Sequence, residues 1–327
     1  MNWQQLSFAL FGNWRYDKPF SESPPYNNFS KKSPMSNANL ARLLLLGLIW
    51  GTSFMLMRIA APVFGPMLTT FGRATLGALA LYLYARYSGV DFAWRRNAKT
   101  YLIIGVSNTA IPFSLFAWSA LYIPSAYMAT MNSLAPIFTA VFGFLLLAER
   151  LTTLRIAAFL LGLFGVAVLV GIGPTAITPE VIGGVLAGIG AAINYGFAAT
   201  YTRMNAKDIP SVATAAGSQC AAALVLLPFA IPAIPHAIAF GTVQACIAVV
   251  ILGLVCTGVA YGLFFHLIAT EGASKAVTVT FLVPATASVW AWLLLSEPIT
   301  LGTVIGISIV LFATSMALGL IKKPMFR

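Results

Sequence analysis

Arg73 is one of a small number of polar side chains that interrupt long apolar stretches of this sequence. A polar group at the depth of a bilayer is costly, so each such residue is a candidate functional group. Arg73 could attract a substrate carboxylate or form part of a gate; alternatively, it snorkels outward or bonds a neighbouring carbonyl. His266 could titrate in a proton-coupled cycle, although a lone histidine in such a stretch is more often a hydrogen-bonded contact between helices.

Amide and aromatic side chains complete the set of candidate substrate-binding residues. Amides in an apolar helix bundle either bridge helices or line a wet cavity, while aromatic rings offer stacking faces together with a single polar group. Packing explains Trp50 nearly as well, and a position in an interfacial aromatic belt explains Trp118 nearly as well. The full candidate set is Trp50, Arg73, Asn108, Trp118, Asn132, Asn194, Tyr195, Tyr261 and His266.

Two glutamates end apolar stretches and are candidates for gating or coupling. A carboxylate at the C-terminal end of a helix opposes the helix dipole, so Glu149 and Glu297 should each have a partner. Arg150 and Arg155 are candidate partners for Glu149. Structural pairing is the simpler role for both glutamates, and gating is the more specific one.

Three prolines lie inside apolar stretches, at Pro112, Pro136 and Pro284. Each removes a backbone hydrogen bond from a helix, which predicts either a hinge or a static kink. A hinge at these positions would contribute to gating, whereas a static kink would only shape the helix.

The residues missing from the apolar stretches limit the chemistry. Aspartate and glutamate are missing from their interiors, so a proton relay of buried carboxylates is not predicted, and any coupling proton would have to use Glu297 or His266. A deep lysine pair that would hold a phosphate is also missing, which favours a neutral or zwitterionic substrate. Two histidines, and three cysteines without CxxC spacing, predict no metal site, no disulfide framework and no cofactor.

The composition places these residues in a membrane protein. Hydrophobic residues make up 59% of 327 positions and charged residues 8%, whereas a soluble globular chain carries about 25% charge. A chain this apolar could not cover its own surface with polar groups in water. The net charge of +11 is divided among short loops rather than gathered in a stripe, which argues against a nucleic-acid partner. The lipid bilayer is therefore the expected partner, and helices are the expected elements.

Ten apolar stretches of membrane-spanning length follow one another from residue 40 onward. If the N-terminus is cytoplasmic, 17 of the 19 lysines and arginines fall in cytoplasmic segments, and Arg58 and Arg73 are the two exceptions. This asymmetry is what the positive-inside rule predicts for ten spans with both termini in the cytoplasm. The predicted spans are residues 40–60, 66–87, 101–121, 124–148, 153–171, 180–202, 210–232, 242–269, 273–296 and 298–320.

The sequence also repeats itself once. The segment SLAPIFTAVFGFLLLAERLT matches FLVPATASVWAWLLLSEPIT at a shift of 148 residues, which aligns Glu149 with Glu297. WGTSFMLMR matches YGFAATYTR at a shift of 145 residues, which aligns Arg58 with Arg203. Each copy holds five predicted helices, an odd number, so the second copy must enter the membrane from the opposite side. Inverted repeats of this kind are a transporter architecture, with the binding site near the midplane between the halves.

The repeat defines the domain organisation. The polar N-terminal segment is rich in Asn, Ser and Pro, lacks the features of a signal peptide, and is expected to be a disordered cytoplasmic tail. The fold class is an all-α integral membrane protein with ten helices in two inverted five-helix repeats. The predicted domains are this tail at residues 1–38, a first repeat at 39–172, a second repeat at 173–321, and a cytoplasmic C-terminal tail at 322–327.

Four motifs, in order along the predicted helices, carry a family resemblance. They are WGTSF in the first helix, FGRATLGALAL in the second, SAYMATMNSLAPIFTAVFGFLLLAERLT around the fourth, and the degenerate copy ending LLLSEPIT around the ninth. Together they resemble the drug/metabolite transporter superfamily, in particular its EamA-like permeases, over residues 40–321. Pro298 after Glu297 departs from the usual pattern. The resemblance implies ten helices around a central cavity, alternating access, and frequent export of amino acids or related metabolites.

The chain is therefore expected to be an inner-membrane, or plasma-membrane, transporter that exports a small-molecule substrate and is not an enzyme. The resemblance makes amino acids the first candidate substrates, and hydrophobic drugs or toxic compounds the second. A multi-pass membrane enzyme is less favoured because the sequence contains no HExxH or GxSxG motif. A channel is also less favoured, since neither a repeated pore loop nor a ring of like charges is apparent.

Overall fold

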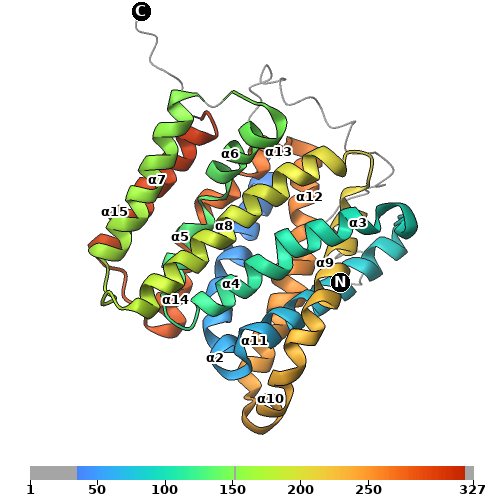
Figure 1. Cartoon of the computed structure of the whole chain (residues 1–327), viewed down its shortest axis with the longest axis horizontal. Helices are drawn as coiled ribbons and strands as arrows, with labels where there is room; N and C mark the ends of the chain where they lie inside the picture. The colour runs from blue at the N-terminus through green and yellow to red at the C-terminus, as the bar shows by residue number, and fades with distance from the viewer. Residues whose placement is uncertain (1–34, 151, 321–327) are drawn as a thin grey trace, which may run out of the picture.

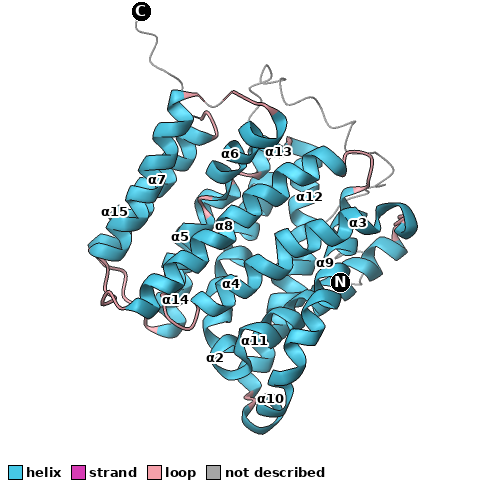
Figure 2. Ribbon diagram, in the orientation of Figure 1, coloured by secondary structure: helices cyan, strands magenta, loops and turns pink. Residues whose placement is uncertain are grey.

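The computed structural model describes residues 35–150 and 152–320, and every regular element within these ranges is a helix (Figure 2). Most of the expected N-terminal tail, and all of the expected C-terminal tail at 322–327, lie outside the described residues. The first described helix begins at Asn37, where the Ser36 side chain accepts a hydrogen bond from the Asn39 N–H at 3.2 Å. A serine cap of this kind satisfies a backbone donor that the helix leaves open at its start.

Seven helical stretches within the described residues are long and apolar enough to cross a membrane, and α14 and α15 are shorter apolar helices. The long helix α2 covers both of the first two predicted spans, so the count of ten spans stays a prediction. The elements are α2 (Asn37–Tyr87), α3 (Trp94–Gly105), η2 (Val106–Ala110), α4 (Ile111–Ser119), α5 (Ser125–Asn132), α6 (Ala135–Leu147), α7 (Thr153–Gly171), α8 (Pro179–Asn205), α9 (Ser211–Ala230), η3 (Ile231–Ala233), α10 (Ile234–Phe240), α11 (Val243–Gly253), η4 (Leu254–Val259), α12 (Ala260–Glu271), α13 (Ala273–Ala276), α14 (Val279–Leu295) and α15 (Leu301–Ala317).

A bend at Gly65 divides α2 into two helical segments, which run in different directions in Figure 1. Gly65 has φ 75° and ψ 158°, a conformation that is essentially restricted to glycine. Pro66 follows it and cannot donate the backbone hydrogen bond that would continue the first segment. The two spans predicted to be separated by a short loop are therefore joined at a single residue.

The repeat in the sequence produces the same turn twice. Ala148 and Ser296 follow α6 and α14 with left-handed φ values of 53° and 54°. Directly after them, the N–H groups of Glu149 and Glu297 each donate to the carbonyl six residues earlier, both at 3.2 Å. These bonds satisfy carbonyls that the end of a helix leaves open. The turn presents a glutamate at the end of each of these helices.

Equivalent helices of the two halves cross in the same way. Gly51 of α2 lies against Thr286 of α14, and a Cβ at Gly51 would come 2.2 Å from the Thr286 hydroxyl oxygen. Gly196 of α8 lies against Phe138 of α6, and a Cβ there would come 2.6 Å from the Phe138 Cβ. Glycine is needed at both crossings because the helix backbones approach so closely. Each half thus packs its opening helix into the other half rather than against its own fourth helix.

The helices α7 and α15 pack side by side at one edge of the bundle (Figure 1, left). Gly302, near the start of α15, contacts Ile172, just after α7. Further along, Gly165 of α7 contacts Val310 of α15. The two helices are therefore antiparallel, so the turns that precede them, with Glu149 and Glu297, lie at opposite ends of the bundle.

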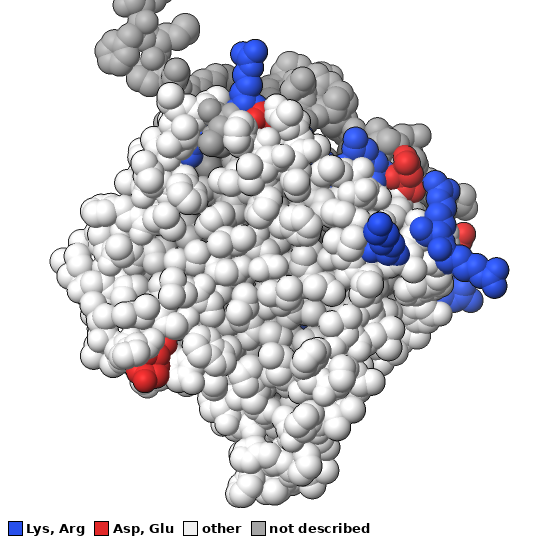
Figure 3. All heavy atoms as spheres, in the orientation of Figure 1, with Lys and Arg blue, Asp and Glu red and all other residues white. Residues whose placement is uncertain are grey.

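Basic side chains gather at one end of the bundle. On the face shown in Figure 3, lysine and arginine atoms lie toward the upper and right-hand margins, and most of the remaining surface is uncharged. In the same orientation, Figure 1 shows the connection between α6 and α7 at the top and α3 at the right. The helix α3 carries Arg95 and Arg96 in its first turn. The basic margin is thus at the Glu149 end.

Candidate functional site

Both halves interrupt their third helix with a π-helical segment at the same place in the repeat. The segment η2 begins at Val106 and η4 begins at Leu254, which are related by the shift of 148 residues. Short π segments are frequent at functional sites, because the extra residue per turn displaces side chains and leaves the backbone ladder less regular. Asn108 lies in η2 and Thr257 in η4, so the two irregular segments supply polar side chains to the middle of the bundle.

Arg73, in the second segment of α2, lies between these segments and is only 7% exposed. Its Nε donates to Thr257 Oγ1 at 3.2 Å, and its Nη1 lies 4.0 Å from Met57 Sδ. Its Cζ is 3.7 Å from the centroid of the Phe113 ring, whose negative face stabilises the positive charge. Among the described residues, no carboxylate lies within salt-bridge distance of Arg73.

Further polar groups surround this arginine. Tyr195 and Tyr261 lie close enough to Arg73 to interact with it electrostatically, and Asn108 Nδ2 donates to the Tyr261 hydroxyl at 3.2 Å. Gln219 also approaches Tyr261, and its buried Oε1 has no hydrogen-bond partner among the described residues. We refer to these residues as the Arg73 cluster: Arg73, Asn108, Phe113, Tyr195, Gln219, Thr257 and Tyr261.

A second polar group, the Glu297 cluster, joins the two halves at one end of the bundle. Arg58 Nε lies 3.1 Å from Glu297 Oε1, and Arg58 Nη1 also donates to the carbonyls of Ala120 and Ile123 at 3.0 and 3.3 Å. Ser125 donates to Glu297 through its backbone N–H at 2.9 Å and its hydroxyl at 3.2 Å. The Glu297 side chain is 12% exposed, so this carboxylate is nearly enclosed and fully hydrogen-bonded.

The Glu149 cluster is the repeat-related counterpart at the opposite end. Glu149 pairs with Arg203 of α8, the residue that the repeat aligns with Arg58, and with Arg155 of α7 at 3.6 Å. The sequence predicted Arg150 or Arg155 as partners, and the structure brings in Arg155 together with the distant Arg203. The Arg203 side chain is 52% exposed, so this cluster is far more open to its surroundings than the Glu297 cluster.

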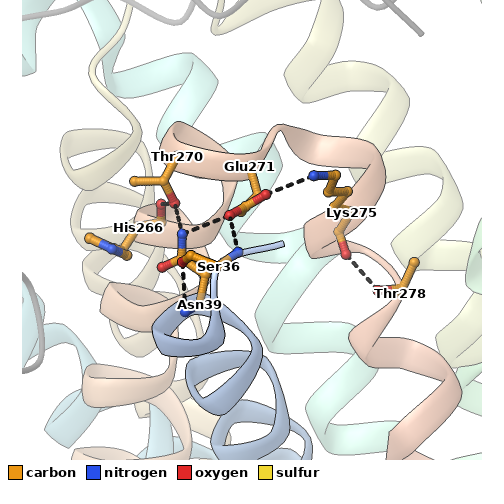
Figure 4. Close-up of polar contacts among 7 residues, drawn as sticks. All are labelled: Ser36, Asn39, His266, Thr270, Glu271, Lys275 and Thr278. Atoms are coloured by element: carbon orange, nitrogen blue, oxygen red, sulfur yellow. Dashed lines mark hydrogen bonds and ion pairs between the residues drawn. The ribbon is translucent and has the colours of Figure 1, made fainter. Parts of the chain in front are cut away.

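A third network ties the start of α2 to the end of α12 (Figure 4). Asn39 Nδ2 donates to Thr270 Oγ1 at 3.2 Å and to Glu271 Oε1 at 2.9 Å. Lys275 Nζ pairs with Glu271 Oε2 at 2.8 Å. These contacts fix one half to the other near the first residues of the helical bundle.

His266, a predicted site residue, lies beside this third network and not in the Arg73 cluster. Its backbone carbonyl accepts from Thr270 Oγ1 at 2.8 Å, and its ring points away from the glutamate in Figure 4. The side chain is 7% exposed, on the buried face of α12. The structure therefore keeps His266 apart from the buried arginine with which it was grouped.

Three of the predicted substrate-binding residues, Arg73, Tyr195 and Tyr261, lie within electrostatic range of one another, and Asn108 is hydrogen-bonded to Tyr261. Four others are not part of the Arg73 cluster. Their positions are as follows: the Trp50 ring packs on Phe264 at 5.2 Å, Trp118 packs on Tyr122 at 4.9 Å and is 37% exposed, Asn194 donates to the Gly190 carbonyl of its own helix at 2.9 Å, and Asn132 is half-buried as the last residue of α5.

The three predicted hinge prolines have different surroundings. Pro112 directly follows the π segment η2 at the start of α4, and Pro136 follows the break between α5 and α6. Pro284 lies inside α14, which continues through it without interruption. A π-helical segment therefore precedes Pro112 and a helix break precedes Pro136, whereas Pro284 has neither beside it.

Phe113, Gln219 and Thr257 are site residues that the sequence reasoning did not select. The repeat carried the available signal, because the shift of 148 residues aligns Phe113 with Tyr261 and Thr109 with Thr257. The repeat also contained a signal for the ion pairs, since it aligns Arg58 with Arg203 and Glu149 with Glu297. It was the crossing of the halves, and not the alignment, that paired Arg58 with Glu297.

Comparison with known proteins identifies a family. The EamA-like transporter family matches residues 40–171 and again residues 182–319. The uncharacterized transporter YoaV of Bacillus subtilis is 25% identical over 81% of this chain and 91% of its own length. A protein of Streptantibioticus cattleyicolor named a probable terminal-alkyne amino-acid exporter is 25% identical over 85% of this chain and 93% of its own length.

A solved structure has a similar fold. It superposes with a TM-score of 0.58 over 86% of this chain and 97% of its own chain, at 20% sequence identity. Identity at this level supports the shared arrangement of helices alone. The family match to two successive segments of similar length indicates that the chain is built from two copies of one unit.

Proposed function

Because this chain belongs to the EamA-like transporter family, we propose that it is a secondary transporter that carries a small metabolite across the cell membrane by alternating access. The relatives named above are themselves called transporters, and the resemblance drawn from the sequence motifs to the EamA-like permeases is confirmed. Alternating access requires one binding site and two closures that open in turn.

One observation carries this proposal: a central buried arginine lies in a bundle whose opposite ends are closed by repeat-related ion pairs. The Arg58–Glu297 pair and the Arg203–Glu149 pair each join one half to the other. Opening either end requires its own pair to separate, and the inverted repeat makes the two closures equivalent in position. We assign substrate binding to the Arg73 cluster and gating to the Glu297 and Glu149 clusters.

Helix flexibility supports the same cycle. The π segments η2 and η4 and the break before Pro136 leave the backbone ladder weaker than a continuous α-helix. We propose that these segments bend when one end opens, and that Pro112 and Pro136 mark the hinges. Pro284 sits in a continuous helix and is the weakest of the three hinge candidates.

The proposed topology has ten spans with both termini in the cytoplasm. The bend at Gly65 supports two spans within α2, and the basic margin at the Glu149 end supports a cytoplasmic location for that end. The Glu297 end would then face outward. The expected location is the plasma membrane, with lipid around the exposed leucine, isoleucine and phenylalanine side chains.

Amino acids are the first substrates to test, in the direction of export. Support comes from the related protein named a probable terminal-alkyne amino-acid exporter. Hydrophobic or toxic compounds are the second class. A coupling proton would bind at Glu297 or His266. Glu297 is the favoured site, because its side chain is the less exposed of the two gating glutamates, at 12% against 28% for Glu149.

The test is exchange transport in proteoliposomes loaded with a candidate amino acid. Saturable uptake that is stimulated by the internal solute supports a carrier. Flux that rises linearly with concentration would support a channel, and turnover without flux would support an enzyme; either result would overturn the proposal. In the same assay, Arg73→Ala should lower transport of a carboxylate-bearing substrate at least ~10-fold, the effect of losing about 1.4 kcal/mol. Arg96→Ala, at the exposed start of α3, is the matched control.

A further inference from the structure

Within residues 35–150 and 152–320, the charge of Arg73 has no counter-charge at its own depth. The six acidic residues within the described ranges lie in loops or at helix ends, at Asp91, Glu149, Glu180, Asp208, Glu271 and Glu297. The other arginine in the interior of α2, Arg58, is already paired with Glu297. A buried charge without a partner is strongly unfavourable. A ligand that supplies one negative charge would remove this penalty.

The geometry leaves donors available for such a ligand. A guanidinium has five N–H donors in one plane. Among the described residues, Arg73 uses Nε toward Thr257 and Nη1 toward the weak acceptor Met57 Sδ. Phe113 covers one face of the plane at 3.7 Å from Cζ and leaves the edge of the fork for a hydrogen-bonded partner. A planar carboxylate matches that edge with two parallel bonds.

The side chains around Arg73 also indicate which other groups the ligand should carry. Gln219 is 1% exposed, and its Oε1 has no partner among the described residues, so it can accept a hydrogen bond from a ligand hydroxyl. Tyr195 and Tyr261 supply neutral hydroxyls, and the Tyr195 ring packs on Phe116 at 6.3 Å. An ammonium group bound here would meet neutral oxygens and a positive guanidinium, with no carboxylate to balance it. A single cation likewise does not balance a phosphate dianion.

We infer that the Arg73 cluster binds organic monocarboxylates with an apolar body, and discriminates against the zwitterion of the same carbon skeleton. This inference rests on the proposed carrier function but replaces amino acids as the preferred substrate class: the ligand keeps the carboxylate and apolar body of an amino acid and lacks its charged amine. It differs from the neutral or zwitterionic substrate expected from composition, because the structure buries Arg73 and shows which neutral groups among the described residues surround it.

The experiment uses three ligands with one skeleton: 3-phenyllactate, phenylalanine and phenethylamine. Their binding is measured by thermal shift on the purified full-length chain in detergent, with sodium chloride titrated separately. We expect 3-phenyllactate to raise the melting temperature with an apparent Kd at least ~10-fold below that of phenylalanine, and phenethylamine to give no shift. Equal or tighter binding of phenylalanine, no binding by any of the three, or an equal shift with chloride alone would each overturn the inference.

Variants of Arg73 separate ligand binding from a structural role. Arg73→Gln removes the uncompensated charge, so it should raise the ligand-free melting temperature and abolish the shift with 3-phenyllactate. Arg73→Lys keeps the charge and loses the fork, so it should weaken binding ~10-fold without raising the ligand-free value. A lower ligand-free melting temperature in Arg73→Gln, with the 3-phenyllactate shift retained, would assign the arginine to structure alone.

Liposome exchange keeps the two proposals distinguishable. Exchange of phenylalanine without exchange of 3-phenyllactate would overturn the monocarboxylate inference and leave the carrier function standing. Binding of 3-phenyllactate with no exchange of any tested solute would overturn the carrier function and leave the anion site standing.

Discussion

The Glu297 cluster and the Glu149 cluster occupy equivalent places in the repeat. The two clusters differ in how strongly they hold the two ends of the bundle closed. At the Glu297 end, Glu297 is 12% exposed and receives hydrogen bonds from Arg58 and from both the N–H and the hydroxyl of Ser125. At the Glu149 end, the carboxylate side chain is 28% exposed and its partners, Arg155 and Arg203, are 33% and 52% exposed. Two copies of the same sequence motif therefore stabilise the closed state of their two ends by different amounts.

Burial explains the difference. Exposed ion pairs contribute about 0–1 kcal/mol, because water and salt screen them and both side chains lose freedom. A buried pair that loses one partner costs about 3–5 kcal/mol, since the remaining charge stays uncompensated. The Glu297 cluster lies between these limits and the Glu149 cluster near the lower one. We therefore expect the Glu149 end to open first, so that the ligand-free protein spends more time open at that end.

Replacing Glu297 should have the largest effect on this asymmetry. In Glu297→Gln the half-buried Arg58 keeps its two carbonyl acceptors but loses its counter-charge, so the protein should lose about 2–3 kcal/mol of stability. A cysteine in place of buried Ala126, introduced after removing the three native cysteines, should become labelled at least ~5-fold faster, because the Glu297 end opens more often. Glu180→Gln, an exposed acid in the first turn of α8, is the control. An unchanged labelling rate would show that Glu297 does not hold this end closed.

Replacing the arginine of each cluster by lysine should have the next largest effect, measured as the exchange rate. Arg58 donates from Nε to the carboxylate and from Nη1 to two carbonyls, which a lysine ammonium cannot reproduce in the same plane. Arg58→Lys should lower the exchange rate about 5-fold, while Arg203→Lys should stay within about 2-fold of the wild type. Equal losses in both variants, measured at the same reconstitution density, would remove the predicted asymmetry.

A smaller effect is expected from Glu149. Glu149→Gln should change stability by no more than about 1 kcal/mol, since both arginine partners remain solvated. A cysteine in place of Thr200, which is 2% exposed and bonds the Thr139 carbonyl, should nevertheless be labelled about 2-fold faster. Labelling at Ala126→Cys is the internal control and should not rise. A stability loss as large as that of Glu297→Gln would contradict the comparison.

Salt should give the smallest effect. Raising the ionic strength from 0.1 M to 1 M shortens the Debye length from about 10 Å to about 3 Å, and exposed charges are screened more than buried ones. Labelling at Thr200→Cys should rise by less than about 2-fold, and labelling at Ala126→Cys should stay constant. Potassium chloride and potassium acetate should act alike if screening is the cause. A larger rise at Ala126→Cys would reverse the assignment of the more exposed cluster.

Much of the helical architecture was predictable from local composition. Nearly every apolar stretch is helical, because backbone groups in an apolar solvent must satisfy each other within the segment. The bend at Gly65 was not anticipated, and the first two predicted spans are parts of one element. The number of spans in a bilayer stays a prediction, as do the disordered N-terminal tail and the roles of the site residues.

The candidate site was predicted less completely. Arg73, Tyr195, Tyr261 and Asn108 were selected because polar and aromatic groups in apolar helices need partners, and the structure places them near one another, with Asn108 hydrogen-bonded to Tyr261. Trp50, Trp118, Asn194 and His266 satisfied the same criterion, but each of them contacts residues outside the Arg73 cluster. Depth along a helix can be counted from a sequence, whereas the direction in which a side chain points depends on how its helix is rotated against the others.

The sequence by itself determined a membrane-embedded helical chain with an internal repeat, because hydrophobicity and the recurrence of short motifs are properties of the chain alone. The tertiary structure decided the partners: Arg58 with Glu297, Arg203 with Glu149, and Arg73 with Phe113 and Thr257. It also decided that the Glu297 carboxylate is more enclosed than the Glu149 carboxylate, at 12% against 28% side-chain exposure. The physical reason is that pairing and burial depend on the crossing of helices from opposite halves, which are far apart in sequence and meet only when the two copies interlock.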